Sequence, residues 1–153
     1  MVIQRWQTLL LLVAAVMMGL FSFCSLGQIQ GAELTVNYTA LGMTVVGDGA
    51  TYMSTYYLFV ISILSMLLAL IAIFRFKAPK VQRKICRINL LLVAATIVTA
   101  WLTERYAEVP GATEGIGWSS IVIAPFVALV ALICAIRCIS SDIRKLSGYE
   151  RLR

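Results

Sequence analysis

The sequence predicts an all-α membrane protein: a bundle of four transmembrane helices with both chain ends in the cytoplasm and a small β-ribbon in the first extracytoplasmic loop. Three observations predict this fold class. The chain of 153 residues is 61% hydrophobic and only 13% charged, about half the charged fraction of a soluble domain. Its apolar residues gather in four uncharged runs, and its basic residues gather almost entirely in the segments on one side of those runs.

The four apolar runs predict helices at about 6–27, 53–74, 88–103 and 115–138. At about 1.5 Å of rise per residue, a run of 22 residues extends about 33 Å and spans a hydrocarbon core of about 30 Å. The third run reaches only about 24 Å, so we expect Glu104 and Arg105 to extend it by directing their charged ends outward. Pro125 lies within the fourth run, and we expect it to kink that helix.

The distribution of lysine and arginine predicts the orientation. Twelve of the 13 basic residues lie at the N-terminus, in the 75–87 loop, at the end of the fourth run or in the 140–153 tail. The opposite side has Arg105 alone. Because basic residues next to membrane spans stay in the cytoplasm, both termini are expected there.

The 28–52 loop is the longest predicted extramembrane segment. Residues 34–39 alternate apolar and polar side chains, which is typical of a strand with one covered face. Residues 44–46 predict a second strand before the Gly47-Asp48-Gly49 turn. An isolated hairpin is only marginally stable in water, so a ribbon of two or three strands should rest on the helix ends.

The residues available for chemistry argue against an enzyme. The chain has no histidine, its four cysteines form no C-x-x-C pair, and no ionisable side chain other than cysteine or tyrosine falls at mid-membrane depth. We therefore expect no catalytic site, no cofactor and no metal. The basic residues flank apolar runs, a placement that favours anionic lipid headgroups over nucleic acid as their partner.

Small and hydroxylated residues recur at helical spacing on each run. Such stripes allow helices to approach closely in lipid. We expect them to serve packing within one chain, with oligomerisation or docking to a partner as the alternative. The stripes are Ala15, Gly19 and Ser22; Ser62, Ser65, Ala69 and Ala72; Thr96, Thr99 and Thr103; and Ala124, Ala128, Ala131 and Ala135.

Polar residues are concentrated on the predicted cytoplasmic face, which we interpret as a candidate interaction surface. Its expected partners are the anionic headgroups and either another membrane protein or a second copy of the chain. The candidate residues are Gln4, Arg5, Gln7, Arg83, Arg87, Asn89, Asp142, Arg151 and Arg153.

Three segments resemble domain-of-unknown-function family 4293, a family of small bacterial membrane proteins. They are the opening Met1-Val2-Ile3-Gln4-Arg5-Trp6-Gln7, the segment 82–89 entering the third helix, and the basic end Arg151-Leu152-Arg153. The resemblance covers the whole chain with similar helix spacing. It implies a location in a bacterial inner membrane and carries no catalytic activity.

The leading hypothesis is a non-enzymatic scaffold or accessory subunit of a membrane complex. One alternative is a transport or channel component that acts as an oligomer, with a pathway lined by Ser62, Ser65, Thr96 and Thr99. A second alternative is a claudin-like contact protein that uses its outer loop, although this loop lacks the tryptophan and cysteine pair of that family.

Overall fold

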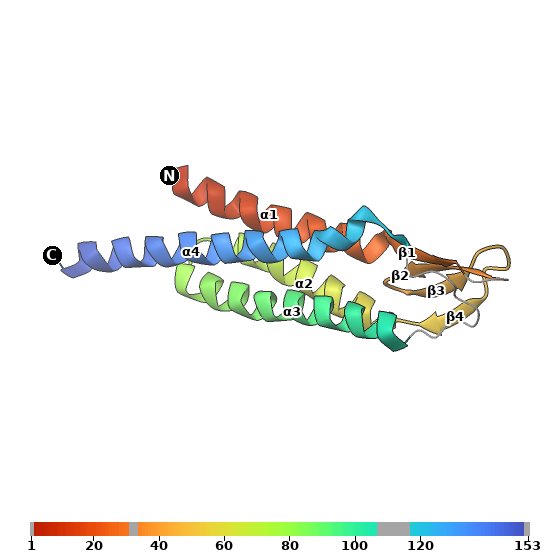
Figure 1. Ribbon diagram of the computed structural model, residues 1–153. Helices are drawn as coiled ribbons and strands as arrows, with labels where there is room; N and C mark the ends of the chain where they lie inside the picture. Colours follow the sequence, from red (N-terminus) through yellow and green to blue (C-terminus); the bar gives the residue numbers. More distant parts are fainter. Residues whose placement is uncertain (1, 31–33, 107–116, 152–153) are drawn as a thin grey trace.

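Four long helices run side by side in a computed structural model that describes residues 2–30, 34–106 and 117–151 (Figure 1). For residues 2–5, 52 and 146–151 only the backbone is described. The helices are α1 (Val2–Phe23), α2 (Tyr56–Phe74), α3 (Pro79–Tyr106) and α4 (Ala124–Arg151). Each contains a segment long and apolar enough to cross a membrane.

The helices form a ring in which each one packs mainly against two neighbours: α1 and α3 both contact α2 and α4. Both ends of the described chain and the α2–α3 link at 75–78 lie at one end of the bundle, here called the basic end. All the strands lie at the opposite end, here called the sheet end (Figure 1).

The small-residue stripes face the inside of the bundle, which confirms that they serve packing within one chain. The stripes on α2 and α4 are buried along their whole length, from Ser62 to Ala72 and from Ala124 to Ala135. On α1, a Cβ added at Gly19 would lie 3.2 Å from the Met66 sulfur of α2. Small side chains therefore set how closely the helices approach.

A five-stranded antiparallel sheet covers the sheet end, in the order β4-β3-β2-β1-β5. The strands are β1 (Ser25–Gln30), β2 (Thr35–Thr39), β3 (Gly42–Val45), β4 (Thr51–Ser54) and β5 (Gly117–Trp118). The expected ribbon of two or three strands was too small. Residues assigned to the end of the first helix pair with β2 instead, and β5 adds a strand from the segment before α4.

One face of the sheet closes the end of the bundle. Leu26, Ile29, Val36, Tyr38 and Met43 are buried there in one cluster with residues of the helix ends. The Thr55 hydroxyl, just before α2, faces the carbonyl oxygens of Thr39 and Ala40 at 3.1 Å each. The sheet therefore packs against the helix ends. This agrees with the expectation that a small sheet in isolation would be only marginally stable in water.

The predicted third helix, 88–103, was too short. Helix α3 begins at Pro79 and ends at Tyr106, so it extends about 42 Å, and the predicted 75–87 loop shrinks to residues 75–78. Lysine and arginine are good helix formers, so the change from apolar to basic residues does not end the helix. The 140–153 tail is likewise helical as far as Arg151.

The predicted kink at Pro125 was also wrong. Pro125 is the second residue of α4, and residues Ser120–Ile123 before it form a short 3-10 helix, η1. A proline in the first helical turn removes no intrahelical hydrogen bond, because those N–H groups have no acceptor within the helix. The predicted 115–138 span therefore began too early and stopped too soon.

Candidate functional site

Two of the predicted interface residues join α1 to α4 at the basic end. The Gln7 side chain is buried, and its Nε2 donates a hydrogen bond to Oδ2 of Asp142. A carboxylate accepting a bond from a shielded amide makes a stronger contact than a neutral pair. Gln7 and Asp142 therefore bind each other within the chain.

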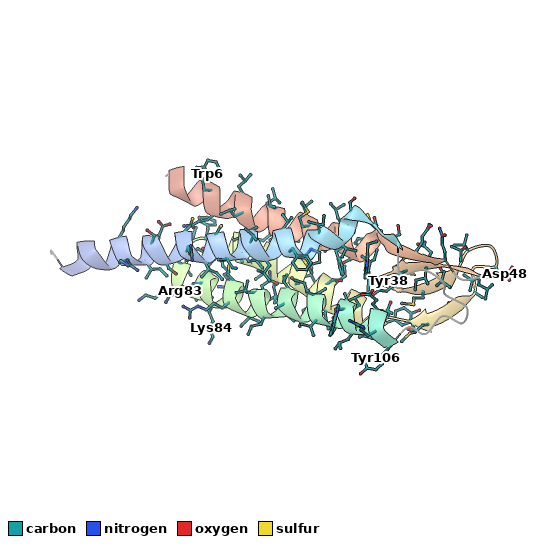
Figure 2. All side chains as sticks on the ribbon, in the orientation of Figure 1. Trp6, Tyr38, Asp48, Arg83, Lys84 and Tyr106 are labelled. Atoms are coloured by element: carbon teal, nitrogen blue, oxygen red, sulfur yellow. The ribbon has the colours of Figure 1, made fainter. Side chains whose placement is uncertain are left out.

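Several basic side chains lie at the same end of the bundle as this hydrogen bond. Arg83 is half-buried and Arg87 is exposed, one helical turn apart on α3; Figure 2 shows Arg83 and Lys84 at this end of the bundle. For Gln4, Arg5 and Arg151 only the backbone is described, and Arg153 lies outside the described residues. The exposed basic side chains at this end include Lys77, Lys80, Lys84, Arg87, Arg137 and Lys145.

Asn89 does not lie at the basic end. It is 1% exposed, and its Oδ1 accepts a 2.6 Å hydrogen bond from the Ser65 hydroxyl. Ser65 is the central residue of α2, so this contact is at mid-bundle. The prediction placed Asn89 one turn inside the third helix, and the residue lies deeper because α3 begins nine residues earlier.

Three further polar contacts of buried side chains connect helices in the described bundle. Ser22 of α1 donates to Ser62 of α2 at 2.8 Å, and Ser62 donates in turn to the Phe59 carbonyl. Gln82 of α3 donates to the Ala72 carbonyl of α2 at 3.0 Å. Near the sheet end, the hydroxyls of Tyr57 and Thr103 join α2 to α3.

The four residues proposed to line a transport pathway face the same interior. Ser62, Ser65 and Thr96 are fully buried, and Thr99 is half-buried. The hydroxyls of Thr96 and Thr99 bond to carbonyls of their own helix. A pathway along these residues would require the helices of a single chain to separate.

Tyr38 carries an unusual polar group at the junction of sheet and bundle (Figure 2). Its side chain is fully buried. Its hydroxyl lies near Thr103 but forms no hydrogen bond with a described residue. Burial raises the pKa of Tyr38 to about 12, and the nearby groups of Tyr57 and Glu104 act in the same direction. The phenol is therefore held neutral.

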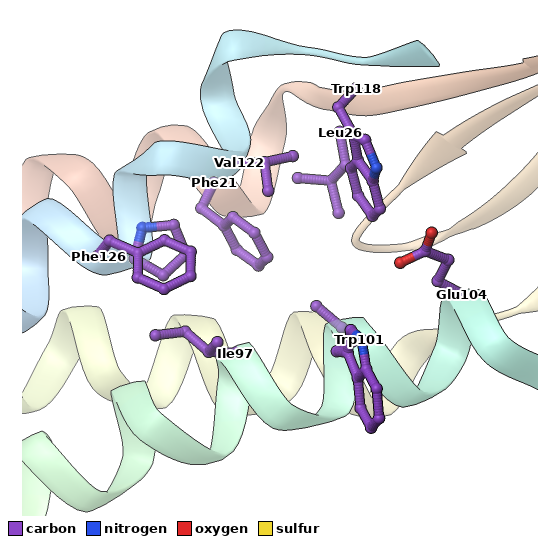
Figure 3. Close-up of a pocket in the computed structure, with 10 residues that line it drawn as sticks. Phe21, Leu26, Ile97, Trp101, Glu104, Trp118, Val122 and Phe126 are labelled. Carbon is purple, nitrogen blue, oxygen red and sulfur yellow. The ribbon is translucent and has the colours of Figure 1, made fainter. Parts of the chain in front are cut away.

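A cavity of about 200 Å³ lies at the sheet end, between α1, α3 and the start of α4 (Figure 3). Its walls are almost entirely apolar. They come from the last turns of α1 and α3, from β1 and β5, and from the first residues of η1 and α4. The labelled lining residues are Phe21, Leu26, Ile97, Trp101, Glu104, Trp118, Val122 and Phe126.

Glu104 is the one charged residue among the described residues that line this cavity. Figure 3 shows its carboxylate directed from α3 toward the side where Leu26 and Trp118 lie. The neighbouring guanidinium of Arg105 lies over the Trp101 ring, 5.3 Å from its centroid. In the described part of the chain no ion pair is formed by Glu104.

The cavity was not predicted, because its walls come from segments that are far apart in the sequence. The sequence contained a partial signal. Trp101, Glu104 and Trp118 lie on either side of the second predicted outer loop, and tryptophan is enriched at the membrane–water boundary. What the sequence could not show is that Phe21 and Leu26 reach the same place.

The described chain is thus a small, mostly helical protein with four helices long and apolar enough to cross a membrane and a small antiparallel sheet at one end. It belongs to the family described as a domain of unknown function (DUF4293), whose profile matches residues 3–152. This confirms the resemblance drawn from the sequence. No curated protein and no solved structure shows significant similarity to the chain.

Proposed function

We propose that this chain is a multi-pass protein of a bacterial inner membrane and acts as a non-enzymatic scaffold or accessory subunit of a membrane complex. The observation that carries the proposal is how the described bundle uses its buried polar side chains. They connect helix to helix or bond to their own helix, which favours a structural role for the interior. The residues concerned are Gln7, Ser22, Ser62, Ser65, Gln82, Asn89, Thr96 and Thr103.

The proposed orientation places the basic end in the cytoplasm. Exposed lysine and arginine side chains gather at this end, and Arg105 is the one basic residue near the sheet end. Basic residues beside membrane spans remain on the cytoplasmic side. The sheet end, with Asp48 in its β3–β4 turn, would then lie outside (Figure 2).

The partner surface in this proposal is the basic end. Because Gln7 and Asp142 bond to each other, the proposal places the contact with another molecule on two arginines of α3, the half-buried Arg83 and the exposed Arg87. Arg83 and Arg87 lie on one face of α3 at i and i+4 spacing. Arginine binds carboxylates in a planar, two-pronged geometry, so an acidic segment of a neighbouring protein suits this face.

Affinity purification of the tagged chain from native membranes tests the proposal. We expect one protein to co-purify in constant proportion and its recovery to fall several-fold with the paired change Arg83→Ala and Arg87→Ala. The control is Leu91→Ala, one turn further along the same face of α3, where the side chain is 72% exposed. A chain recovered with lipid alone, or a partner recovered equally with the arginine variant, would contradict the proposal.

A further inference from the structure

The cavity at the sheet end has the size of a site for part of a ligand. Its volume of about 200 Å³ is below the ~300–1,000 Å³ typical of pockets that enclose a whole small molecule. The described residues of its walls are aromatic and aliphatic apart from Glu104. Such a space suits a few methylene groups of a longer molecule.

The position of the cavity points to the membrane as the source of that molecule. Its walls lie at the last turns of α3 and the first turn of α4, where helices of this length leave the hydrocarbon core. Trp101 and Phe126 line the cavity and are also 53% and 52% exposed on the outer surface of the bundle. A hydrocarbon chain can therefore enter from the side.

The carboxylate of Glu104 indicates which kind of lipid headgroup the cavity would bind. Glu104 is half-buried and forms no ion pair within the described residues, while Arg105 is held over Trp101. A carboxylate partly removed from water is stabilised by a cation that also donates hydrogen bonds. A primary ammonium has three such donors, and the indole rings add favourable contacts with a cation.

We propose that this cavity binds an aminophospholipid, with part of one acyl chain between Phe21, Trp118 and Phe126 and the ammonium group at Glu104. The site depends on membrane insertion but not on the scaffold function, since its residues lie at the opposite end from Arg83 and Arg87. It would fix a lipid of one headgroup class to the seam between α3 and α4.

The three tryptophans supply the probe for a direct test. Trp6 lies at the basic end, whereas Trp101 and Trp118 both line the cavity. In a Trp6→Phe background, the remaining fluorescence therefore reports on the cavity. The protein is placed in nanodiscs of phosphatidylglycerol that contain a trace of lipid with brominated acyl chains, which quench tryptophan on contact.

Brominated phosphatidylethanolamine should quench several-fold more strongly than brominated phosphatidylglycerol at the same mole fraction. Glu104→Gln should remove this preference. Asp48→Asn, which removes an equal charge from the exposed β3–β4 turn, should leave it intact. Ala100→Phe, which fills the cavity, should also remove the preference while leaving Glu104 in place.

Equal quenching by the two lipids in the Trp6→Phe protein would overturn the proposal and favour a protein segment as the occupant. A preference that persists in Glu104→Gln, or that is lost equally in Asp48→Asn, would also overturn it. If Ala100→Phe does not keep the helical circular dichroism of the parent, the Glu104 and Asp48 variants decide the matter by themselves.

Discussion

Asn89 and Ser65 form a hydrogen bond between two side chains that are both shielded from the surroundings of the bundle. A polar group in the middle of an apolar bundle is costly unless it is paired. The pair therefore favours the arrangement in which α2 and α3 present these two positions to each other.

We expect the Ser65–Asn89 pair to couple the two helices energetically. Ser65→Ala and Asn89→Ala should each destabilise the fold. A double-mutant cycle should give a coupling free energy of about 1 kcal/mol, between the average of ~0.6 and the maximum of ~1.7 kcal/mol for such bonds between helices in membranes. Unfolding in mixed detergent micelles measures it. Strictly additive effects of the two substitutions would show that the contact contributes nothing.

Tyr38 gives the fold a dependence on alkaline pH. The phenol has an ordinary pKa of 10.0 and a pKa of about 12 in the fold, chiefly because of burial. As pH rises through this window the unfolded chain loses its proton first, so the free energy of unfolding falls. The loss approaches ~3 kcal/mol once the pH exceeds both values.

Tyr38→Phe should therefore be less sensitive than the parent between pH 10 and pH 12. At neutral pH the same change should be nearly neutral, because the hydroxyl it removes makes no hydrogen bond. Denaturation at neutral and at alkaline pH provides the comparison. The matched control is Tyr56→Phe, since Tyr56 is 62% exposed and should lose stability with pH as the parent does. Identical pH profiles for the parent and Tyr38→Phe would contradict this account.

At the scale of elements, the helices are held at a distance set by small side chains. Ala128 is fully buried where α4 faces the bundle core, and Val130, two residues further along, is 59% exposed on the opposite side. Ala128→Leu should destabilise the bundle by about 1–3 kcal/mol, the cost of overpacking a close-packed core. Val130→Leu should be close to neutral. Equal effects of the two substitutions in a detergent unfolding assay would show that α4 does not pack tightly.

The sheet depends on a hydroxyl that precedes α2. Thr55→Val preserves side-chain volume but removes the hydroxyl that faces the Thr39 and Ala40 carbonyls, so we expect a loss of about 1–2 kcal/mol. The effect should appear locally, as faster proteolysis between β2 and β3. Thr51→Val on β4, where the side chain is exposed, serves as the control. Unchanged cleavage would mean that the sheet does not rely on this contact.

For the whole molecule, the proposed orientation makes a simple labelling prediction. In a cysteine-free background, Asp48→Cys should react with a membrane-impermeant maleimide on intact spheroplasts, whereas Lys77→Cys should react only after the membrane is permeabilised. Both positions are exposed and lie at opposite ends of the bundle. The reverse pattern would invert the topology, and labelling of both from outside would reject membrane insertion as proposed.

The sequence by itself determined the number of helices, their apolar character and the inward direction of the small-residue stripes. These follow from local composition and from the 3.6-residue period, so they need no knowledge of distant contacts. The same local reasoning failed at the ends of the helices. Composition marks where side chains stop being apolar, but a helix ends where its backbone hydrogen bonds stop, as α3 shows at Pro79 and α4 at Arg151.

Only the tertiary structure decided where the polar side chains meet. It moved Asn89 from the predicted interface to the centre of the bundle, joined Gln7 to Asp142 across 135 residues, and enlarged the ribbon to five strands. It also brought Phe21, Glu104 and Trp118 to one cavity. Each of these contacts joins segments that are far apart in the sequence, and their separation along the chain does not predict that they meet. Packing between elements, and not the local preference of any one element, decides which side chains come within contact distance.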